Sequence, residues 1–306
     1  MANISKASTA DVPQAIGTMY SLPSVDGGSS IDKHGMDQVI WIVNMPNIRC
    51  YLKSVALLIA GLLGACNLEG ADMDASNFFQ PEMVSLLQDI QRDNRKRAEQ
   101  KIKSGVSLNV HGKDGITPLF WLIINKDKPA IKLALQLGAD PNFSDPVGDT
   151  PIVIVAGGND DEMLEILLQA GANPNSLDSN GYPTLFAAIG TSNWAQIKRL
   201  IAAGSDINLT DKRNVNSAHY ALYINNFEVA HYLMELGADH AGRTPGGSDM
   251  AWQIHDSLSN ILLDTDTDAY KWAGKVKQQL IDRGVSFPPL SPKEVRVKWA
   301  EEGREN

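Results

Sequence analysis

Thiol and imidazole side chains are among the groups in this 306-residue chain that could act as nucleophiles, general bases or metal ligands. Both cysteines, Cys50 and Cys66, fall near the N-terminus, so no later thiol could serve a disulfide, a cysteine nucleophile or a zinc site. No H-E-x-x-H spacing, G-x-S-x-G motif or phosphate-binding glycine loop occurs. The histidines are His34, His111, His219, His231, His240 and His255. We therefore expect no enzyme, no cofactor and no metal site.

Two other groups of polar residues have structural explanations. Asp264, Asp266 and Asp268 alternate as in a calcium loop, but the glycine and the distal glutamate of an EF-hand are missing. We expect a solvated acidic loop over 262–270. A second group recurs at turn positions and is expected to bond local backbone, namely Asp140, Asn142, Asn175, Asp206 and Asn208.

The sequence before Cys66 indicates a use for its thiol. From Met45 onward, Arg49 and Lys53 precede an apolar run over 54–65, and small residues lead into the cysteine. A charged n-region, a short apolar helix and small residues before a cleavage point are the parts of a signal peptide. The run is too short for a membrane span, which needs about 20 apolar residues. A buried apolar helix is the other alternative.

The motif Leu63-Gly64-Ala65-Cys66 resembles the lipobox of bacterial lipoproteins. The resemblance implies lipidation of Cys66, cleavage just before it, and a protein anchored in the outer membrane facing the periplasm. Residues 45–65 are then the signal peptide, 66–79 a tether, and 1–44 a mis-assigned start or a disordered segment. If 1–44 is real, the signal becomes an internal anchor or has no role, and a cytoplasmic location is the alternative.

Past residue 100 the sequence repeats itself. Gly105, Gly138, Gly171, Gly204 and Gly237 each follow an amphipathic helical pattern, and every step between them is 33 residues. A second ladder follows the first three of these glycines after ten residues: Gly115-Ile116-Thr117-Pro118-Leu119, Gly148-Asp149-Thr150-Pro151-Ile152 and Gly181-Tyr182-Pro183-Thr184-Leu185. Two ladders with one period predict a stack of similar units.

These ladders resemble the ankyrin repeat, roughly over 105–287. The resemblance implies an all-α solenoid of stacked helix pairs with short β-hairpin loops. The fourth unit is degenerate at its start but keeps His219 and Ala221, and a histidine at this place implies a hydrogen bond to backbone near the hairpin. The third unit inverts Thr-Pro to Pro183-Thr184, which we expect to loosen the cap of its first helix.

The residue types of each unit have mechanical reasons. Threonine caps the first helix, proline takes its first position, and glycine ends the second helix in a left-handed conformation. We assign 80–104 to an N-terminal capping helix, 105–240 to the repeats, 241–290 to a divergent C-terminal repeat and cap, and 291–306 to a tail. Residues expected to pack between units are Leu133, Leu135, Ile166, Leu167, Leu200, Ile201, Leu233 and Met234.

The ankyrin resemblance also implies a groove formed by the hairpin tips and the first helices. The position after the histidine place reads Trp121, Ile154, Ala187, Tyr220 and Gln253. We expect Trp121 and Tyr220 to face solvent as interface anchors. Structural packing is the alternative for both residues, with Trp121 folded over the first repeat as a cap. The expected polar rim comprises Lys113, Asp114, Asp145, Asp178, Tyr182, Lys212 and Arg213.

A net charge of −9 disfavours binding to nucleic acid or anionic lipid headgroups, which requires a basic face, and fits a basic protein partner. A lipid-anchored ankyrin solenoid is similar in arrangement to immunity lipoproteins that neutralise toxins, such as phospholipases, delivered by type VI secretion. We expect a monomer that binds one protein. The alternatives are an envelope scaffold and, if the signal is spurious, a cytoplasmic or host-directed ankyrin protein.

Overall fold

The computed structural model describes residues 73–259 and 264–304, all within one compact unit, Leu68–Asn306. Apart from an isolated bridge between Leu177 and Pro183, the regular structure of these residues is helical, which confirms the expected all-α class. The helices are η1 (Ala75–Asn77), α3 (Pro81–Gln91), α4 (Arg95–Lys103), η2 (Lys113–Gly115), α5 (Pro118–Ile124), α6 (Lys128–Gln136), α7 (Pro151–Ala156), α8 (Asp161–Gln169), α9 (Thr184–Gly190), α10 (Trp194–Ala202), α11 (Ser217–Tyr223), α12 (Phe227–Glu235), α13 (Met250–Ser259), α14 (Asp268–Asp282) and α15 (Pro292–Glu301).

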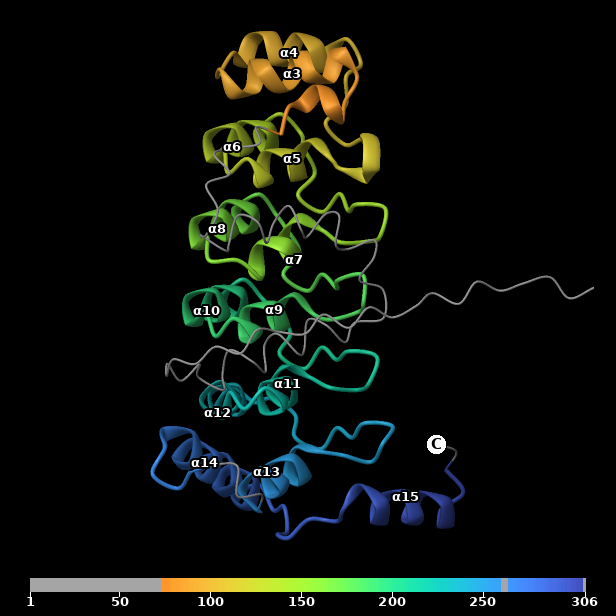
Figure 1. Ribbon diagram of the computed structural model, residues 1–306, viewed down its shortest axis with the longest axis vertical. Coiled ribbons are helices and arrows are strands. Elements are labelled where there is room, and N and C mark those ends of the chain that lie inside the picture. Colours follow the sequence, from red (N-terminus) through yellow and green to blue (C-terminus); the bar gives the residue numbers. More distant parts are fainter. Residues whose placement is uncertain (1–72, 260–263, 305–306) are drawn as a thin grey trace, which may run out of the picture. The chain divides into compact units, whose positions relative to one another are not determined.

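Consecutive helices pair, and the pairs stack in chain order (Figure 1). The pairs are α3 with α4, α5 with α6, α7 with α8, α9 with α10, α11 with α12 and α13 with α14. First helices of neighbouring pairs pack on each other, as α7 does on both α5 and α9. The loops between pairs project to one side of the stack, where they lie one above another (Figure 1).

The start of each first helix shows how the threonine positions behave. The Thr117 hydroxyl accepts the N–H of Phe120 at 3.2 Å, as expected of a cap. Thr150 makes no such bond, and its buried hydroxyl has no partner among the described residues. Thr184 lies inside α9 and donates its hydroxyl to the carbonyl oxygen of Ser176 at 2.8 Å. The inverted Pro-Thr therefore ties the helix start to its hairpin and does not cap it.

Second helices carry a cap that the sequence patterns above did not include. An Asp or Asn side chain accepts the backbone N–H three residues later at the start of each of four second helices. These N-cap residues are Asp127, Asp160, Asn193 and Asn226. The expected glycine ends are confirmed, because Gly138, Gly171, Gly204 and Gly237 all have φ between 90° and 98°.

An asparagine ladder, Asn109, Asn142 and Asn175, joins successive units. The Asn142 Nδ2 donates to the carbonyl oxygen of Gly171 at 3.0 Å, and its Oδ1 accepts the N–H of Asn173 at 2.8 Å. Asn109 and Asn175 make the equivalent two bonds to their next units. The expected local bonds are also present, such as Asn142 N–H to Asp140 at 2.8 Å. These side chains therefore connect units as well as closing turns.

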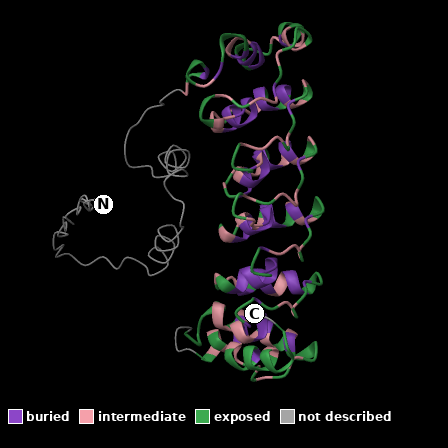
Figure 2. Cartoon of the chain, turned by 90° about the vertical axis from the view of Figure 1, so that its right-hand side faces the viewer, coloured by how far each residue is buried: buried purple, intermediate pink, exposed green. Residues whose placement is uncertain are grey.

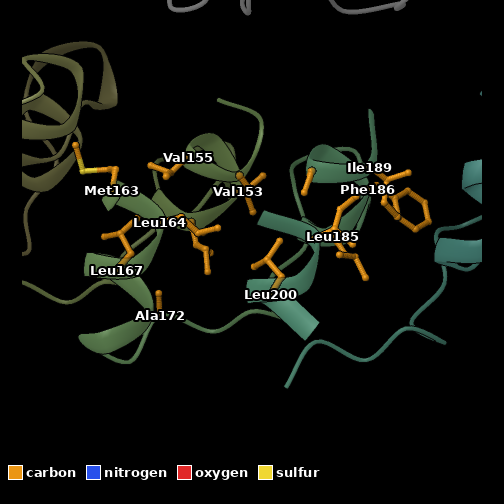
Figure 3. Close-up of a cluster of buried hydrophobic side chains, with 14 of the residues drawn as sticks. Val153, Val155, Met163, Leu164, Leu167, Ala172, Leu185, Phe186, Ile189 and Leu200 are labelled. Atoms are coloured by element: carbon orange, nitrogen blue, oxygen red, sulfur yellow. The ribbon is translucent and has the colours of Figure 1, made fainter. Parts of the chain in front are cut away.

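Buried residues recur along the length of the stack (Figure 2), and most of them are apolar. Figure 3 shows one part of this core, with side chains from α7, α8, α9 and α10. Most residues expected between units are buried: Leu133, Ile166, Leu167, Leu200, Leu233 and Met234. Leu135 and Ile201 are half-buried and pack against the edge of the core.

The two ends of the described chain differ from the expected boundaries. Residues 80–104 form two helices, α3 and α4, because the chain turns at Asp93, whose φ is 55°. They make a helix pair like the later ones, where we expected a single capping helix. The expected tail contains α15, which begins with a capping box in which Ser291 and Glu294 each accept the other's backbone N–H.

Candidate interaction surface

Two tyrosines and an arginine meet on the hairpin side of the third and fourth units. The guanidinium carbon of Arg213 lies 5.8 Å from the ring centroid of Tyr182 and 5.8 Å from that of Tyr223. Tyr182 is half-buried, whereas Arg213 and Tyr223 are exposed. We call these three residues the Tyr–Arg cluster. Aromatic rings and a guanidinium on a rigid support are typical of protein-binding surfaces.

Asp211 holds Arg213 in this position. Its Oδ2 lies 2.8 Å from Nη2 and 2.9 Å from Nε of Arg213, and its side chain is buried. Its Oδ1 accepts the backbone N–H groups of Arg213 and Val215, which folds the loop tip. One carboxylate therefore shapes the tip and orients the guanidinium, so the Tyr–Arg cluster is preorganised.

The same aspartate position recurs at the two preceding tips. Asp145 accepts the N–H groups of Val147 and Asp149, and Asp178 accepts those of Asn180 and Tyr182. Asp145 and Asp178 were expected as rim residues. Both are half-buried, and their carboxylates close the turns that present their neighbours.

Tyr220 lies beneath this surface, so the expectation that it faces solvent is wrong. It is 9% exposed, and its ring stacks on Phe186 of the preceding unit with centroids 4.3 Å apart. Phe186 also lies 6.2 Å from Tyr182. Burial raises the pKa of the Tyr220 phenol to about 12. Tyr220 supports the Tyr–Arg cluster from the core side.

Trp121 is also buried, at 4% exposure, and the expectation of a solvent-facing anchor is wrong here too. Its indole Nε1 donates to the carbonyl oxygen of Met73 at 2.7 Å. The segment before α3 therefore covers Trp121. This arrangement matches the alternative expectation, in which Trp121 packs at the first repeat. A tryptophan with its N–H satisfied in this way stabilises the end of the stack.

The remaining predicted partner residues lie at or near the surface. Ile154 in α7 is half-buried, whereas Lys113 in η2 and Lys212 at the fourth tip are exposed. The Lys212 stem crosses Gly181, where a Cβ would lie 2.9 Å from the lysine Cε and where φ is 87°. Glycine at this place lets neighbouring tips approach.

His219 fills a structural place, but not through the expected hydrogen bond. It is 2% exposed, its ring stacks on Tyr223 with centroids 4.8 Å apart, and its Nε2 has no hydrogen-bond partner among the described residues. Burial lowers the pKa of this imidazole to about 4. His219 is therefore a neutral ring that supports Tyr223 from below.

Tyr223 is the surface residue that the sequence patterns missed. It lies at the end of α11, outside the repeat position used to select groove residues, and no ladder marks it.

A second group that the patterns missed lies on the second helices. There Trp194 packs edge-on against Tyr232 at 5.4 Å, and His231 against Trp272 at 5.2 Å.

Three further findings concern the described residues. No group of three or more His, Cys, Asp or Glu residues within 73–259 and 264–304 is placed to hold a metal ion. No helix in these ranges is both long and apolar enough to span a bilayer. In the acidic loop, Asp264 accepts the N–H of Asp266, and Thr267 caps α14.

The predicted start at Met45, the signal peptide over 45–65 and the lipidation at Cys66 lie outside the described residues.

A family model described as ankyrin repeats in three copies matches residues 73–178 and 153–244, more than half of the chain. The chain belongs to the ankyrin-repeat proteins. Ankyrin repeats are protein-interaction modules, and the proteins that contain them are generally non-enzymatic scaffolds. A search of curated proteins found no match to this chain.

Proposed function

We propose that this chain is a lipid-anchored ankyrin protein of the cell envelope that binds and blocks a secreted antibacterial toxin, such as a phospholipase. The observation that supports the binding part is the Tyr–Arg cluster. An ion pair with Asp211 holds its arginine in place, and the stacked rings of Phe186 and Tyr220 lie beneath the cluster. A preorganised surface of this kind loses little side-chain entropy when a partner docks. The net charge of −9 favours a basic partner.

The toxin-blocking part rests on the combination of binding module and export signal. The motif ending at Cys66 would place the repeats at the membrane, where an incoming toxin must act or pass. A stoichiometric inhibitor needs a surface and no catalytic group. Ile154, Lys113 and Lys212 would extend the contact from the Tyr–Arg cluster to other units, while the buried Trp121 and Tyr220 would stabilise the fold.

The binding test is co-expression of the full chain with the product of the neighbouring gene, followed by pull-down and a survival assay. Tyr182→Ala and Arg213→Ala should each weaken binding about thirtyfold, the cost of removing a central interface residue. Arg213→Lys should also weaken it, because a compact ammonium cannot present the planar, delocalised surface of a guanidinium to the two tyrosine rings. Arg304→Ala is the matched control, since Arg304 is exposed and pairs with Glu302 near the C-terminus.

The outcomes separate the proposal from its competitors. Full protection with Tyr182→Ala and Arg213→Ala combined, at unchanged circular dichroism, would exclude this surface as the toxin contact. Binding without protection would favour an envelope scaffold.

The anchor is tested separately by membrane fractionation. Wild-type chain should label with palmitate and sediment with the outer membrane, whereas Cys66→Ser should be soluble or unprocessed. A chain started at Met45 should behave as the longer one, because the signal parts all follow that residue. Unlabelled wild-type protein in the cytoplasm would favour the cytoplasmic or host-directed alternative.

A further inference from the structure

The first helix pair carries a basic surface that the overall charge of the chain conceals. Polar residues of α3 and α4 line an open hollow of about 500 Å³, among them Ser85, Gln88, Arg92, Arg97, Gln100 and Ser104. The apolar stripe of α3 lies on its other side, with Met83, Leu86, Leu87 and Ile90 buried. The hollow is therefore on the face of this pair that turns away from the core.

The guanidinium groups of Arg92 and Arg97 supply the unbalanced charge of this hollow. The other charged lining residues, Asp89 and Lys101, form an ion pair, and Lys101 Nζ also donates to the carbonyl oxygen of Ser85 at 2.8 Å. The Lys101 ammonium lowers the pKa of the Asp89 carboxyl. The two charges therefore neutralise each other, and this carboxylate does not offset the arginines. Arg92 and Arg97 are exposed and form no direct ion pair with another described residue.

Charged residues along the chain also separate into a basic stretch near α4 and an acidic remainder. Residues 92–103 hold Arg92, Arg95, Lys96, Arg97, Lys101 and Lys103 against Asp93 and Glu99. Residues 104–306 hold 17 basic against 25 acidic residues. A terminal unit needs only polar residues to stay soluble. Basic residues here, in an otherwise acidic chain, give the first helix pair a positive charge. An anionic surface would attract this pair and repel the rest of the chain.

In the sequence this positively charged pair closely follows the proposed anchor, and the inference rests in part on that proposal. Met73 follows Cys66 by seven residues, and an extended chain of that length spans at most about 25 Å. We infer that the α3–α4 surface binds anionic phospholipid headgroups, with Arg92 and Arg97 on their phosphates. Guanidinium groups suit this role because they bind phosphate oxygens in pairs. The contact would orient the stack so that its later pairs project away from the bilayer.

The test uses the full chain bearing Cys66→Ser, so that lipidation does not contribute. Vesicles of phosphatidylcholine alone are compared with vesicles containing phosphatidylglycerol, by co-sedimentation at low and high salt. Each basic residue near an anionic surface strengthens binding about fivefold. Arg92→Gln with Arg97→Gln should therefore weaken binding to the anionic vesicles about 25-fold, and glutamate at both places should weaken it further.

Controls isolate this surface from other contributions. Arg49, Lys53 and the apolar run at 54–65 are common to all variants, so their contribution cancels in the comparison. Lys293→Glu with Lys298→Glu changes two exposed lysines of α15 and should leave vesicle binding unchanged. Circular dichroism checks that the glutamine variant is folded. Equal binding of that variant and the parent to anionic vesicles, or no preference of the parent for them, would overturn the inference.

The result is distinguishable from failure of the proposed anchor. Vesicle binding that depends on Arg92 and Arg97, in a chain whose Cys66 is never labelled in cells, would keep the surface and remove the anchor. Labelled Cys66 with no arginine-dependent vesicle binding would do the reverse.

Discussion

The ring of Tyr220 lies flat on the ring of Phe186, with centroids 4.3 Å apart and planes within 5° of parallel. Tyr220 belongs to α11 and Phe186 to α9, so this stack joins two neighbouring units beneath the Tyr–Arg cluster. The side chain that the repeat position suggested as an anchor is thus a support, and its substitution should affect stability before it affects binding.

Tyr220→Ala should lower the free energy of unfolding by about 3 kcal/mol, because a buried ring is lost and a cavity remains. Tyr220→Phe keeps the stacked ring and should cost less than about 1 kcal/mol. Urea unfolding followed by circular dichroism measures both values. Equal stability of the alanine variant and the wild type would mean that the ring is not packed as described.

The register of the stack is tested at Leu167, which is fully buried in α8. Leu167→Asp places an unpaired carboxylate in the core and should cost several kcal/mol, about 4 or more. Ala195→Asp introduces the same side chain at an exposed site in the first turn of α10, where a negative charge is tolerated or favoured. Thermal unfolding should separate the two variants clearly, and similar melting temperatures would argue against this packing.

His219 should make stability depend on pH. Its folded pKa is about 4, below the value of 6.5 expected for the unfolded chain, even though the Asp249 and Asp211 carboxylates favour its charged form. The unfolded state therefore binds the proton first as pH falls. The associated stability is present above pH 6.5 and lost between pH 6.5 and 4, about 3 kcal/mol in full.

The measurement compares urea unfolding at pH 7.5, 5.5 and 4.5 for wild type and His219→Gln. Glutamine does not titrate, so the variant should lose less stability on acidification, whatever its stability at pH 7.5. Parallel pH profiles for the two proteins would assign the acid sensitivity to other groups.

The asparagine ladder should contribute through both ends of each amide. Asn142→Ala removes the bonds to the Gly171 carbonyl oxygen and the Asn173 N–H, and should cost about 1–3 kcal/mol at about 1 kcal/mol per net bond. Asn142→Asp keeps the acceptor and should cost less. Asn180→Ala, at an exposed loop tip, is the control. A cost no larger than that of the control would show that solvent replaces both bonds.

The sequence predicts those parts of the fold that depend on one residue and its immediate backbone. The glycines at the helix ends and the Thr117 cap follow from local conformation, and the burial of Leu167 follows from helical periodicity. Trp121 and Tyr220 were placed wrongly because a repeat position indicates a helix face but not what covers it. Met73, which covers Trp121, precedes the first repeat motif, and its contact spans 48 residues.

The Tyr–Arg cluster could be predicted only in part for the same reason. Tyr182 and Arg213 were selected separately as rim residues, but their proximity depends on how successive loop tips stack. Tyr223 comes from the end of a helix and has no counterpart in either ladder. The basic surface on α3 and α4 was hidden in the net charge, because a sum over the chain carries no information on where opposite charges segregate.

The asparagine ladder also bears on how a chain of this kind can change its length. Each ladder residue binds the next unit with the same offset, and the ladder repeats every 33 residues. Excision of residues 143–175 would put Asn142 in the place of Asn175, facing the Gly204 carbonyl oxygen. The new junction would reproduce the old hydrogen bonds. Gene duplication or deletion in whole units can thus lengthen or shorten the stack while its joints stay the same, so evolution can match its reach to partners of different size.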